Sequence, residues 1–539
     1  MKKLIITLVS LLILTLLIVG CGGGVQTQTT STPTASNIQA TSSLTVSKYG
    51  GTLRVITAAV PVSPIGMPSE TLGPSLESMK WAEEGPLIQL PDGKLGYKLA
   101  ESAEYDMSPD NSGITIHLKK GIKFHDGTDF NAQAMKWNLD RLIEKGLYGG
   151  TTNWKSWDVI DPYTVRISYK EWRNSMFTDM MEGTMSFMVS PTAFEKNGIE
   201  WMRWNMVGTG PFKQVNFERD ASLALTRWEN YWQSGKPYLD GVKLIYITDE
   251  MTAIATMQSG AADVLMGASA KQAYDLNSAG FKVISRVEGT TALIPDSANP
   301  DSPWSNPKVR EAAEYAIDKQ NLAKTYGYGF WQPAYQIASP IIKPIYDPNY
   351  PGRKYNVEKA KQLLSEAGYP NGFKSKLIAQ NTVNRDILVS IQADLAKVGI
   401  QVDLDMPETA KFNEYMFGSG WSNGLLYTSL FDSMNMNNSL VFYFAEAPLG
   451  SCFKVLQRPA GFQQLLIDSM HAPLADPTVP VGDPAKIKNI VNTIFNNVMA
   501  IPLYHGASIS VTTSKVNDTG FYEQFRSWAF TPENIWLSK

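Results

Sequence analysis

The strongest fold signal of the chain is the stretch Ile116-His117-Leu118-Lys119-Lys120-Gly121-Ile122-Lys123-Phe124-His125-Asp126-Gly127. Its first residues alternate as a β-strand, Lys120-Gly121 predicts a turn, and Ile122–Phe124 predicts a second short strand that ends in a turn at Gly127. Asn131 then stands where a helix over 132–145 needs an N-cap, and the apolar residues of that helix lie mainly on one face. The stretch therefore predicts strand, turn, strand and helix in succession.

Strand and helix patterns continue to alternate on both sides of this stretch. Strands are expected from residue 53 onward and at 164–169, 223–226, 242–247 and 400–404. Helices are expected at 250–259, 307–317, 357–367 and 385–398. No repeat of solenoid length occurs. The pattern indicates an α/β or mixed α+β protein.

Composition excludes several function classes. The chain has 539 residues, of which 43% are hydrophobic and 18% charged, so it can form several cores and is not disordered as a whole. Its 48 basic and 51 acidic residues leave a net charge of −3, which argues against a nucleic-acid partner. Four histidines and two cysteines, Cys21 and Cys452, leave little for a histidine-built metal centre or a disulfide framework. We therefore expect no metal and no cofactor.

The N-terminus carries an export signal. Lys2 and Lys3 precede an apolar run over 4–19, which is shorter than the about 20 residues of a spanning helix. The run ends in Ile18-Val19-Gly20-Cys21, which resembles the lipobox of bacterial lipoproteins. This resemblance implies a signal peptide over 1–20, lipidation of Cys21 and a place on the extracytoplasmic face of a bacterial membrane. An uncleaved anchor with an incidental cysteine is the alternative. The Ser/Thr-rich stretch over 21–48 is expected to be a flexible tether.

Nine segments, in one order from about residue 50 to 505, resemble the family-5 solute-binding proteins of ABC transporters. These segments are Asp92–Ser102, Ile116–Gly127, Val207–Phe212, Asn230–Trp232, Lys236–Val242, Asn306–Asp318, Ala360–Tyr369, Ile391–Ile400 and Ile501–Tyr504. The resemblance implies a two-lobed periplasmic-binding-protein-like α/β fold of type II, with an additional inserted domain. Lobe I is then expected at 46–88, 205–288 and 500–539, the insert at 89–204, and lobe II at 289–499.

The resemblance also implies a function. Such a protein is a monomer that captures a small solute between two closing lobes and delivers it to an ABC permease and ATPase complex. It is not an enzyme. A role on the same fold outside transport, as a chaperone or as a sensor for a membrane kinase, is the alternative that the sequence leaves open.

The expected pocket departs from better-known peptide binders of this family. Those proteins hold the amino terminus of the ligand with an aspartate, usually in an Asp-Pro pair after a Gly-Trp segment, but here no Asp follows Gly420-Trp421 until Asp432. Dipeptide binders also use an arginine upstream of the long helix, and that stretch lacks one here. An oligopeptide and an oligosaccharide or other neutral ligand therefore both stay open, ahead of a nickel chelate or haem. The candidate ligand-binding residues are Trp421, Asn423, Tyr427, Asp432, Asn381, Trp304, Trp81 and Glu84.

Three other motifs have less weight. Gly420-Trp421-Ser422-Asn423-Gly424 matches the G-x-S-x-G pattern of hydrolases, so a lipoprotein hydrolase with Ser422 as nucleophile is a remote alternative. A nucleophile elbow needs a buried strand before the serine, however, and the preceding residues 411–415 are typical of an amphipathic helix. His125-Asp126-Gly127 is expected to be a structural turn, and Cys452 an inert thiol.

Overall fold

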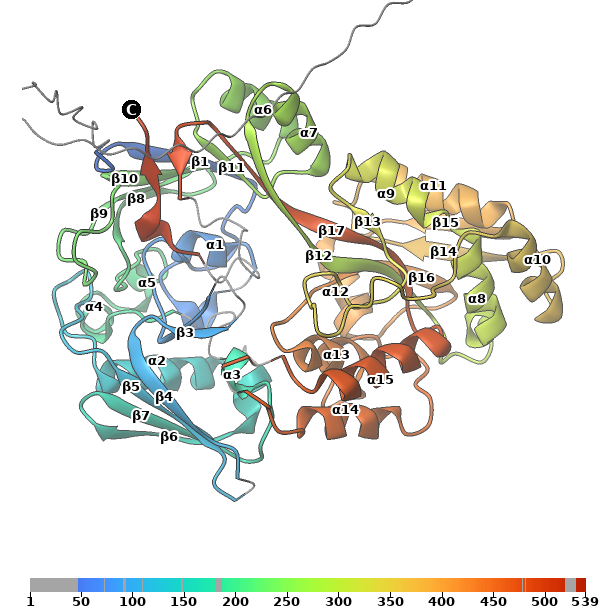
Figure 1. The fold of residues 1–539 in the computed structure, drawn as a ribbon, viewed down its shortest axis with the longest axis horizontal. Helices are drawn as coiled ribbons and strands as arrows, with labels where there is room; N and C mark the ends of the chain where they lie inside the picture. The colour runs from blue at the N-terminus through green and yellow to red at the C-terminus, as the bar shows by residue number, and fades with distance from the viewer. Residues whose placement is uncertain are drawn as a thin grey trace, which may run out of the picture. The chain divides into compact units, whose positions relative to one another are not determined.

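Two long antiparallel strands, β12 (Lys282–Pro295) and β17 (Ile501–Thr512), form the middle of the largest sheet. This sheet runs in the order β15-β14-β16-β12-β17-β11-β1-β10-β9-β8, with β13 paired to β17 (Figure 1). Its other strands are β1 (Thr52–Thr57), β8 (Phe212–Glu218), β9 (Ser222–Arg227), β10 (Gly241–Tyr246), β11 (Val264–Met266), β13 (Gln332–Pro333), β14 (Phe373–Ile378), β15 (Ile400–Asp405) and β16 (Gly424–Leu430). We call β1 and β8–β11 the N-terminal half-sheet and β14–β16 the C-terminal half-sheet.

The structure is a computed structural model. It describes residues 47–539 except 72, 91–93, 109, 147–148, 180–186, 477, 480 and 519–529. The expected signal peptide, the lipidation of Cys21 and nearly all of the tether lie outside the described residues. Residues 47–539 pack as one unit. Within the described ranges, no helix is long and apolar enough to cross a membrane.

Helices lie on both faces of the C-terminal half-sheet, and β16 is buried along nearly its whole length. Adjacent residues of a strand point to opposite faces, so Leu377 and Leu425 enter one core while Ile378 and Leu426 enter another. Near-continuous apolar strands are typical of parallel strands with helices on both sides, and β14 is parallel to both β15 and β16. Helices of the first core are α8 (Pro307–Ala316), α9 (Lys319–Gly327), α10 (Val357–Glu366) and α11 (Arg385–Ala396). Helices of the second core are α12 (Thr409–Phe417), α13 (Met436–Phe444), α14 (Phe462–Met470) and α15 (Pro484–Asn496).

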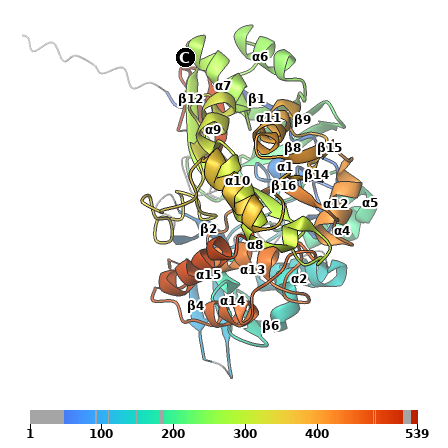
Figure 2. The same cartoon turned by 90° about the vertical axis from the view of Figure 1, so that its right-hand side faces the viewer.

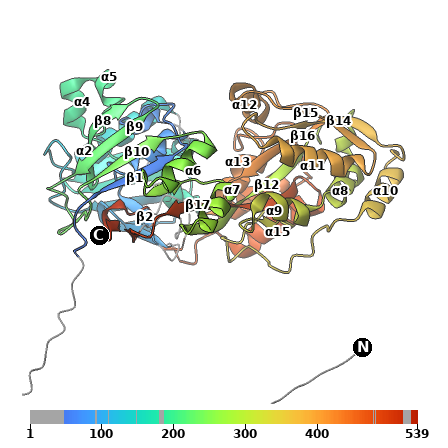
Figure 3. The ribbon, with the colours of Figure 1, turned by 90° about the horizontal axis from the view of Figure 1, so that it is seen from above.

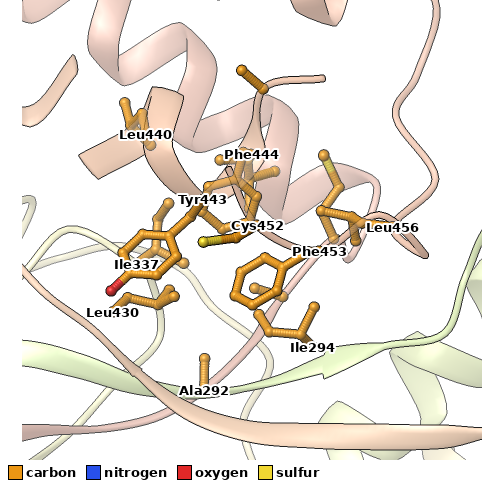
Figure 4. Packing of buried hydrophobic residues seen from close by; sticks show 14 of the residues in the cluster. Ala292, Ile294, Ile337, Leu430, Leu440, Tyr443, Phe444, Cys452, Phe453 and Leu456 are labelled. Carbon is orange, nitrogen blue, oxygen red and sulfur yellow. The ribbon is translucent and has the colours of Figure 1, made fainter. Parts of the chain in front are cut away.

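The figures show both cores from different sides. In Figure 2, α8 and α10, which pack against each other, lie in front of the strands. Figure 4 shows the second core, in which Tyr443 and Phe453 stack with ring centroids 5.6 Å apart beside Cys452. Such close packing over two faces makes the C-terminal half-sheet a rigid platform for any side chain at its strand ends.

In the N-terminal half-sheet too, neighbouring residues of a strand enter cores on opposite faces. Val55 and Ile56 are neighbours on β1 that enter different cores, and the core of Ile56 is covered by α6 (Glu250–Gln258) and α7 (Ala270–Ser278). β12 pairs with β16 at one end, and β17 pairs with β11 at the other, so these two strands connect the half-sheets (Figure 3). Any movement of one half-sheet against the other therefore has to bend β12 and β17.

A separate four-stranded antiparallel sheet lies between β1 and β8 in the chain. Its order is β4-β5-β7-β6, with β4 (Ala100–Asp106), β5 (Gly113–Leu118), β6 (Trp154–Asp161) and β7 (Thr164–Tyr169). Helix α2 (Ala132–Lys145) covers it, and the Asn131 side chain accepts a hydrogen bond of 2.9 Å from the Ala134 backbone N–H. The shorter elements are α1 (Ser75–Met79), α3 (Met176–Asp179), α4 (Pro191–Asn197), α5 (Ile199–Met202), β2 (Leu87–Gln89), β3 (Leu95–Tyr97), β18 (Val516–Asn517), β19 (Trp536–Leu537), and the 3-10 turns Pro68–Glu70, Gly149–Asn153, Pro303–Ser305 and Pro532–Asn534.

The structure confirms the α/β class and most of the predicted elements. The predicted turn at Gly127 is also present, with a φ of 85°. The short strand expected at Ile122–Phe124 is wrong, because only Lys123 pairs there, in a single bridge to Asp129 across the turn. Backbone hydrogen bonds from Phe124 N–H to the Thr128 carbonyl and from Phe130 N–H to the Ile122 carbonyl flank this bridge, so residues 122–124 belong to the turn and not to a strand.

Candidate solute-binding site

Glu84 is the centre of a buried polar cluster beside α1. Its carboxylate accepts hydrogen bonds from the Tyr231 hydroxyl at 2.7 Å, the Trp232 indole N–H at 2.9 Å and the Thr209 hydroxyl at 3.1 Å. Lys98 lies 3.3 Å away. Burial, together with the charge of Glu533, raises the pKa of Glu84, although Lys98 and the hydrogen bonds from Tyr231 and Trp232 act in the opposite direction. The carboxylate thus joins three segments that are distant in the sequence.

Lys98 links Glu84 to a second buried acid. Its ammonium lies 2.5 Å from Glu533 and is buried with it. Burial acts to lower the pKa of Lys98, but Glu533 and Glu84 outweigh it and raise that pKa. The lysine is therefore charged, and the C-terminal segment that carries Glu533 is held against the Glu84 cluster.

A pocket of about 490 Å³ opens at this cluster. Its polar wall contains Lys80, Glu83, Glu84 and Lys98, and its apolar wall contains Leu87, Ile88, Phe187 and Phe530. Glu83 differs from its neighbour, because neither of its carboxylate oxygens has a hydrogen-bond partner within the described ranges, although the residue is only 2% exposed. Burial raises the pKa of Glu83 well above its usual range. Glu83 was not among the residues expected from the sequence.

A second, smaller pocket of about 240 Å³ lies at the end of β16. Asp432 lines it together with Ile337, Phe431, Met436 and Tyr443. The Asp432 carboxylate accepts a hydrogen bond of 2.7 Å from the Gly289 backbone N–H and another from the Ser339 hydroxyl. Asp432, which lines the pocket, is therefore bonded directly to strand β12.

Gly289 is where β12 departs from a regular strand. Its φ of 67° lies in the left-handed region, and the pairing with β17 shifts register between Val287 and Thr290. Next to this bulge, the Thr290 hydroxyl lies 3.0 Å from Nδ1 of His505, and burial lowers the pKa of His505 to about 4. The histidine is therefore neutral at physiological pH, and the Thr290–His505 pair beside the bulge carries no charge.

The residues predicted to bind solute are spread over several environments. Glu84 lies in the first pocket and Asp432 in the second. Tyr427 is buried and its hydroxyl bonds to that of Tyr504. Asn381 and Asn423 are exposed.

The three predicted tryptophans are buried. Trp304 has no exposed surface and donates its N–H to the Ser375 hydroxyl at 2.8 Å. Trp81 has none either, and its ring lies 4.7 Å from that of Phe530. Trp421 donates to the Gly424 carbonyl at 3.1 Å. The structure thus brings Glu84 together with Glu83 and Lys98, but it does not gather the eight predicted residues in one place.

Around Ser422, the helix and the strand come in the reverse of the order that a hydrolase nucleophile requires. Ser422 follows helix α12 and precedes strand β16, whereas a nucleophile elbow follows a strand and begins a helix. His125, which lies in the predicted turn, donates a hydrogen bond of 2.9 Å from Nε2 to the Gly210 carbonyl. Among the described residues, no group of three His, Cys, Asp or Glu side chains is arranged to hold a metal ion.

Comparison with known proteins agrees with this architecture. Residues 94–444 match the family described as bacterial extracellular solute-binding proteins, family 5 Middle. The glutathione-binding proteins GsiB of Shigella flexneri serotype 5b and of Escherichia coli K12 are each 34% identical over 334 residues, which is 61% of this chain and 64% of theirs. The chain thus spans less than two thirds of the length of these relatives.

Solved structures share the fold. The binding protein DppA of Helicobacter pylori, in complex with the peptide STSA, has a TM-score of 0.74 at 23% identity, covering 92% of this chain and 99% of its own. The oligopeptide-binding protein AppA of Bacillus subtilis, in complex with a nonapeptide, has a TM-score of 0.72 at 21% identity, covering 91% and 100%. These likenesses confirm the expected two-lobed architecture. The chain belongs to the bacterial extracellular solute-binding proteins of family 5.

Proposed function

We propose that this protein is the extracytoplasmic receptor of an ABC importer, which captures an oligopeptide or similar small solute between two lobes. The observation that carries the proposal is the strand pair β12–β17, which connects the two half-sheets while a pocket lies on each side of it. A solute that contacts both sides stabilises the closed form over the open one, because those contacts exist together only after closure. The permease and ATPase then receive the loaded form.

The lobes of this proposal keep the expected boundaries. Lobe I contains 46–88, 205–288 and 500–539, with the insert at 89–204, and lobe II contains 289–499. We also propose that Cys21 is lipidated after removal of 1–20, that the stretch to residue 48 tethers a monomeric receptor to the membrane, and that the two pockets belong to opposite lobes. The tether's reach as a flexible coil would be roughly 30 Å.

The relatives support a peptide-like solute. Proteins 34% identical to this chain are described as glutathione-binding, and two proteins of the same fold hold peptides. An oligosaccharide is the alternative that the amide and aromatic side chains of the predicted pocket leave open.

Mass spectrometry of the small molecules released when the purified protein is denatured tests the proposal. Receptors that close over a solute often retain it, since a ligand at 100 times its Kd adds about 2.7 kcal/mol of stability. A thermal-shift panel of glutathione, di- to nonapeptides and oligosaccharides follows. We expect peptides to be released or to raise the Tm. Release or stabilisation by sugars alone would replace the peptide proposal with an oligosaccharide one. Binding of neither peptides nor sugars would overturn the proposal of solute capture.

Matched phenylalanine variants localise the binding. Phe431 and Phe417 are 37% and 41% exposed, but only Phe431 lines the second pocket. We expect Phe431→Ala to weaken binding of the identified solute about tenfold or more, because an aromatic contact is worth about 1 kcal/mol beyond its buried area. Phe417→Ala should leave the Kd within about twofold. Equal effects of the two changes would place the solute elsewhere.

A further inference from the structure

The first pocket contains more hydrogen-bond acceptors than donors. Among the residues that the structure describes, both oxygens of Glu83 and the second oxygen of Glu533 are buried without a hydrogen-bond partner. Glu84, one residue further along, is by contrast satisfied by three donors and a lysine. An isolated buried carboxyl costs several kcal/mol unless a partner compensates it. The site is therefore complementary to a group that brings N–H donors and positive charge.

The surrounding charges do not supply that group. Lys98 is engaged by Glu84 and Glu533, and Lys80 lies 2.7 Å from Glu77. Lys119 donates to the Lys98 carbonyl at 2.6 Å and lies 4.8 Å from the Trp232 ring centroid. The charged groups of this cluster are Glu77, Glu83, Glu84 and Glu533 against Lys80, Lys98 and Lys119. Among the described residues, none of these three lysines is a hydrogen-bond partner of the Glu83 carboxyl.

The backbone holds Glu83 in place. A Cβ added at Gly208 would lie 2.8 Å from both Cα and Cγ of Glu83, and one at Gly210 would lie 2.6 Å from the Ala82 carbonyl carbon. Two glycines thus let the chain pack directly against this side chain. Leu87, Phe187 and Phe530 on the other wall offer apolar contact to the hydrocarbon part of a ligand.

We propose that Glu83 anchors a cationic group of the bound solute, a primary ammonium or a guanidinium, in this pocket. The proposal rests on solute capture as proposed above and names a chemical feature of the solute. Burial favours the protonated form of the Glu83 carboxyl, because it raises the pKa of that group well above the usual range. A cation that enters favours the carboxylate and releases one proton to solvent.

Calorimetric titration of the full-length protein with matched peptides tests this. The probes are N-acetyl-Ala-Lys-Ala-Ala and N-acetyl-Ala-norleucine-Ala-Ala, in which the lysine side chain is the one cation. We expect the wild type to prefer the lysine peptide at least about 30-fold and to release a proton on binding it, measured in two buffers of different ionisation enthalpy. Glu83→Gln should lose both the preference and the proton release. Glu77→Gln removes the same charge from α1 beside Lys80 and should retain both.

A probe that is not a peptide separates this proposal from the function above. The probe is n-butylammonium, with n-butanol as its neutral match. If n-butylammonium releases a proton from the wild type but not from Glu83→Gln, the cation site is supported. If, in addition, neither peptide binds, peptide capture fails while the cation site stands. Equal binding of both peptides, or identical behaviour of Glu83→Gln and Glu77→Gln, overturns the cation site while solute capture stands.

Discussion

Asn174, which follows strand β7, joins the region of the four-stranded sheet to α13 and α14, and its loss should open that contact. Its side-chain amide donates to the Ser469 carbonyl at 2.7 Å and the Ala472 carbonyl at 3.1 Å. Its side-chain oxygen accepts from the amides of Asn435 at 2.9 Å and Asn437 at 3.2 Å. Asn174 has no exposed surface, and Figure 1 shows α3, just after it, beside α13 and α14. One side chain thus makes four hydrogen bonds across this contact.

Asn174→Ala removes all four hydrogen bonds, although the Ser469 carbonyl and the amides of Asn435 and Asn437 each keep one other partner. A neutral hydrogen bond contributes about 0.5–1.5 kcal/mol net, and a buried group left unsatisfied costs about 1–3 kcal/mol. Partial access of water lowers the sum, so we expect the contact to lose about 3–5 kcal/mol. At 1.4 kcal/mol for each factor of ten, the local opening constant rises at least about 100-fold.

Hydrogen exchange measured by mass spectrometry reports that opening directly. The Asn174 backbone N–H bonds to the Met470 carbonyl at 2.8 Å, so peptides covering residues 173–178 and 469–472 contain the affected amides. We expect their protection to fall at least about 100-fold in Asn174→Ala. Asn216→Ala, at an exposed β8 residue that bonds to Glu218, should change protection less than about twofold. A change below tenfold, or equal changes in both variants, would refute the assignment of this contact to Asn174.

Three further results are expected. Glu83→Gln should stabilise the protein increasingly as pH rises above about 4.3, the usual glutamate pKa, because the raised folded-state pKa of Glu83 makes the wild type lose stability between that pH and its folded-state pKa. Chemical denaturation at pH 4 and pH 8 measures the difference in free energy of unfolding between variant and wild type. The same difference at both pH values would contradict this prediction. Asp432→Ala should lower the free energy of unfolding by about 3–5 kcal/mol, because it removes the carboxyl group that accepts hydrogen bonds from the Gly289 N–H and the Ser339 hydroxyl, and a Tm unchanged within 1 °C would be inconsistent with this. Cys452 should react with a thiol reagent only on unfolding, because burial raises its pKa to about 12 and leaves it 3% exposed; stoichiometric labelling of the native protein within seconds would disprove it.

Local signals explain the elements that sequence reasoning predicted correctly. Helix α2 begins after its N-cap Asn131 and ends before Gly146, which adopts a left-handed backbone conformation. Helix α11 likewise begins at Arg385, after the N-cap Asn384, as its apolar stripe predicts. These signals act within a few residues, so they are readable in the chain itself.

The long strands and the pockets depend on distant partners. β12 was not predicted, because Ser285 and Arg286 interrupt its apolar pattern and its pairing with 501–512 lies more than 200 residues away. Six of the eight residues expected to bind solute lie outside both pockets, since a tryptophan suited to stacking on a solute is equally suited to a core.

Glu83 and Glu84 mark the boundary between the two kinds of information. The sequence by itself determined the α/β class, most helices and the family, because periodicity, capping and motif order are local properties of the chain. It could not distinguish two adjacent glutamates, since the difference between them lies in what surrounds each one. Tyr231, Trp232 and Thr209 reach Glu84 from more than 100 residues away, whereas no donor of the described part of the chain reaches Glu83. Tertiary packing alone decided which carboxyl is satisfied and which is left for a ligand.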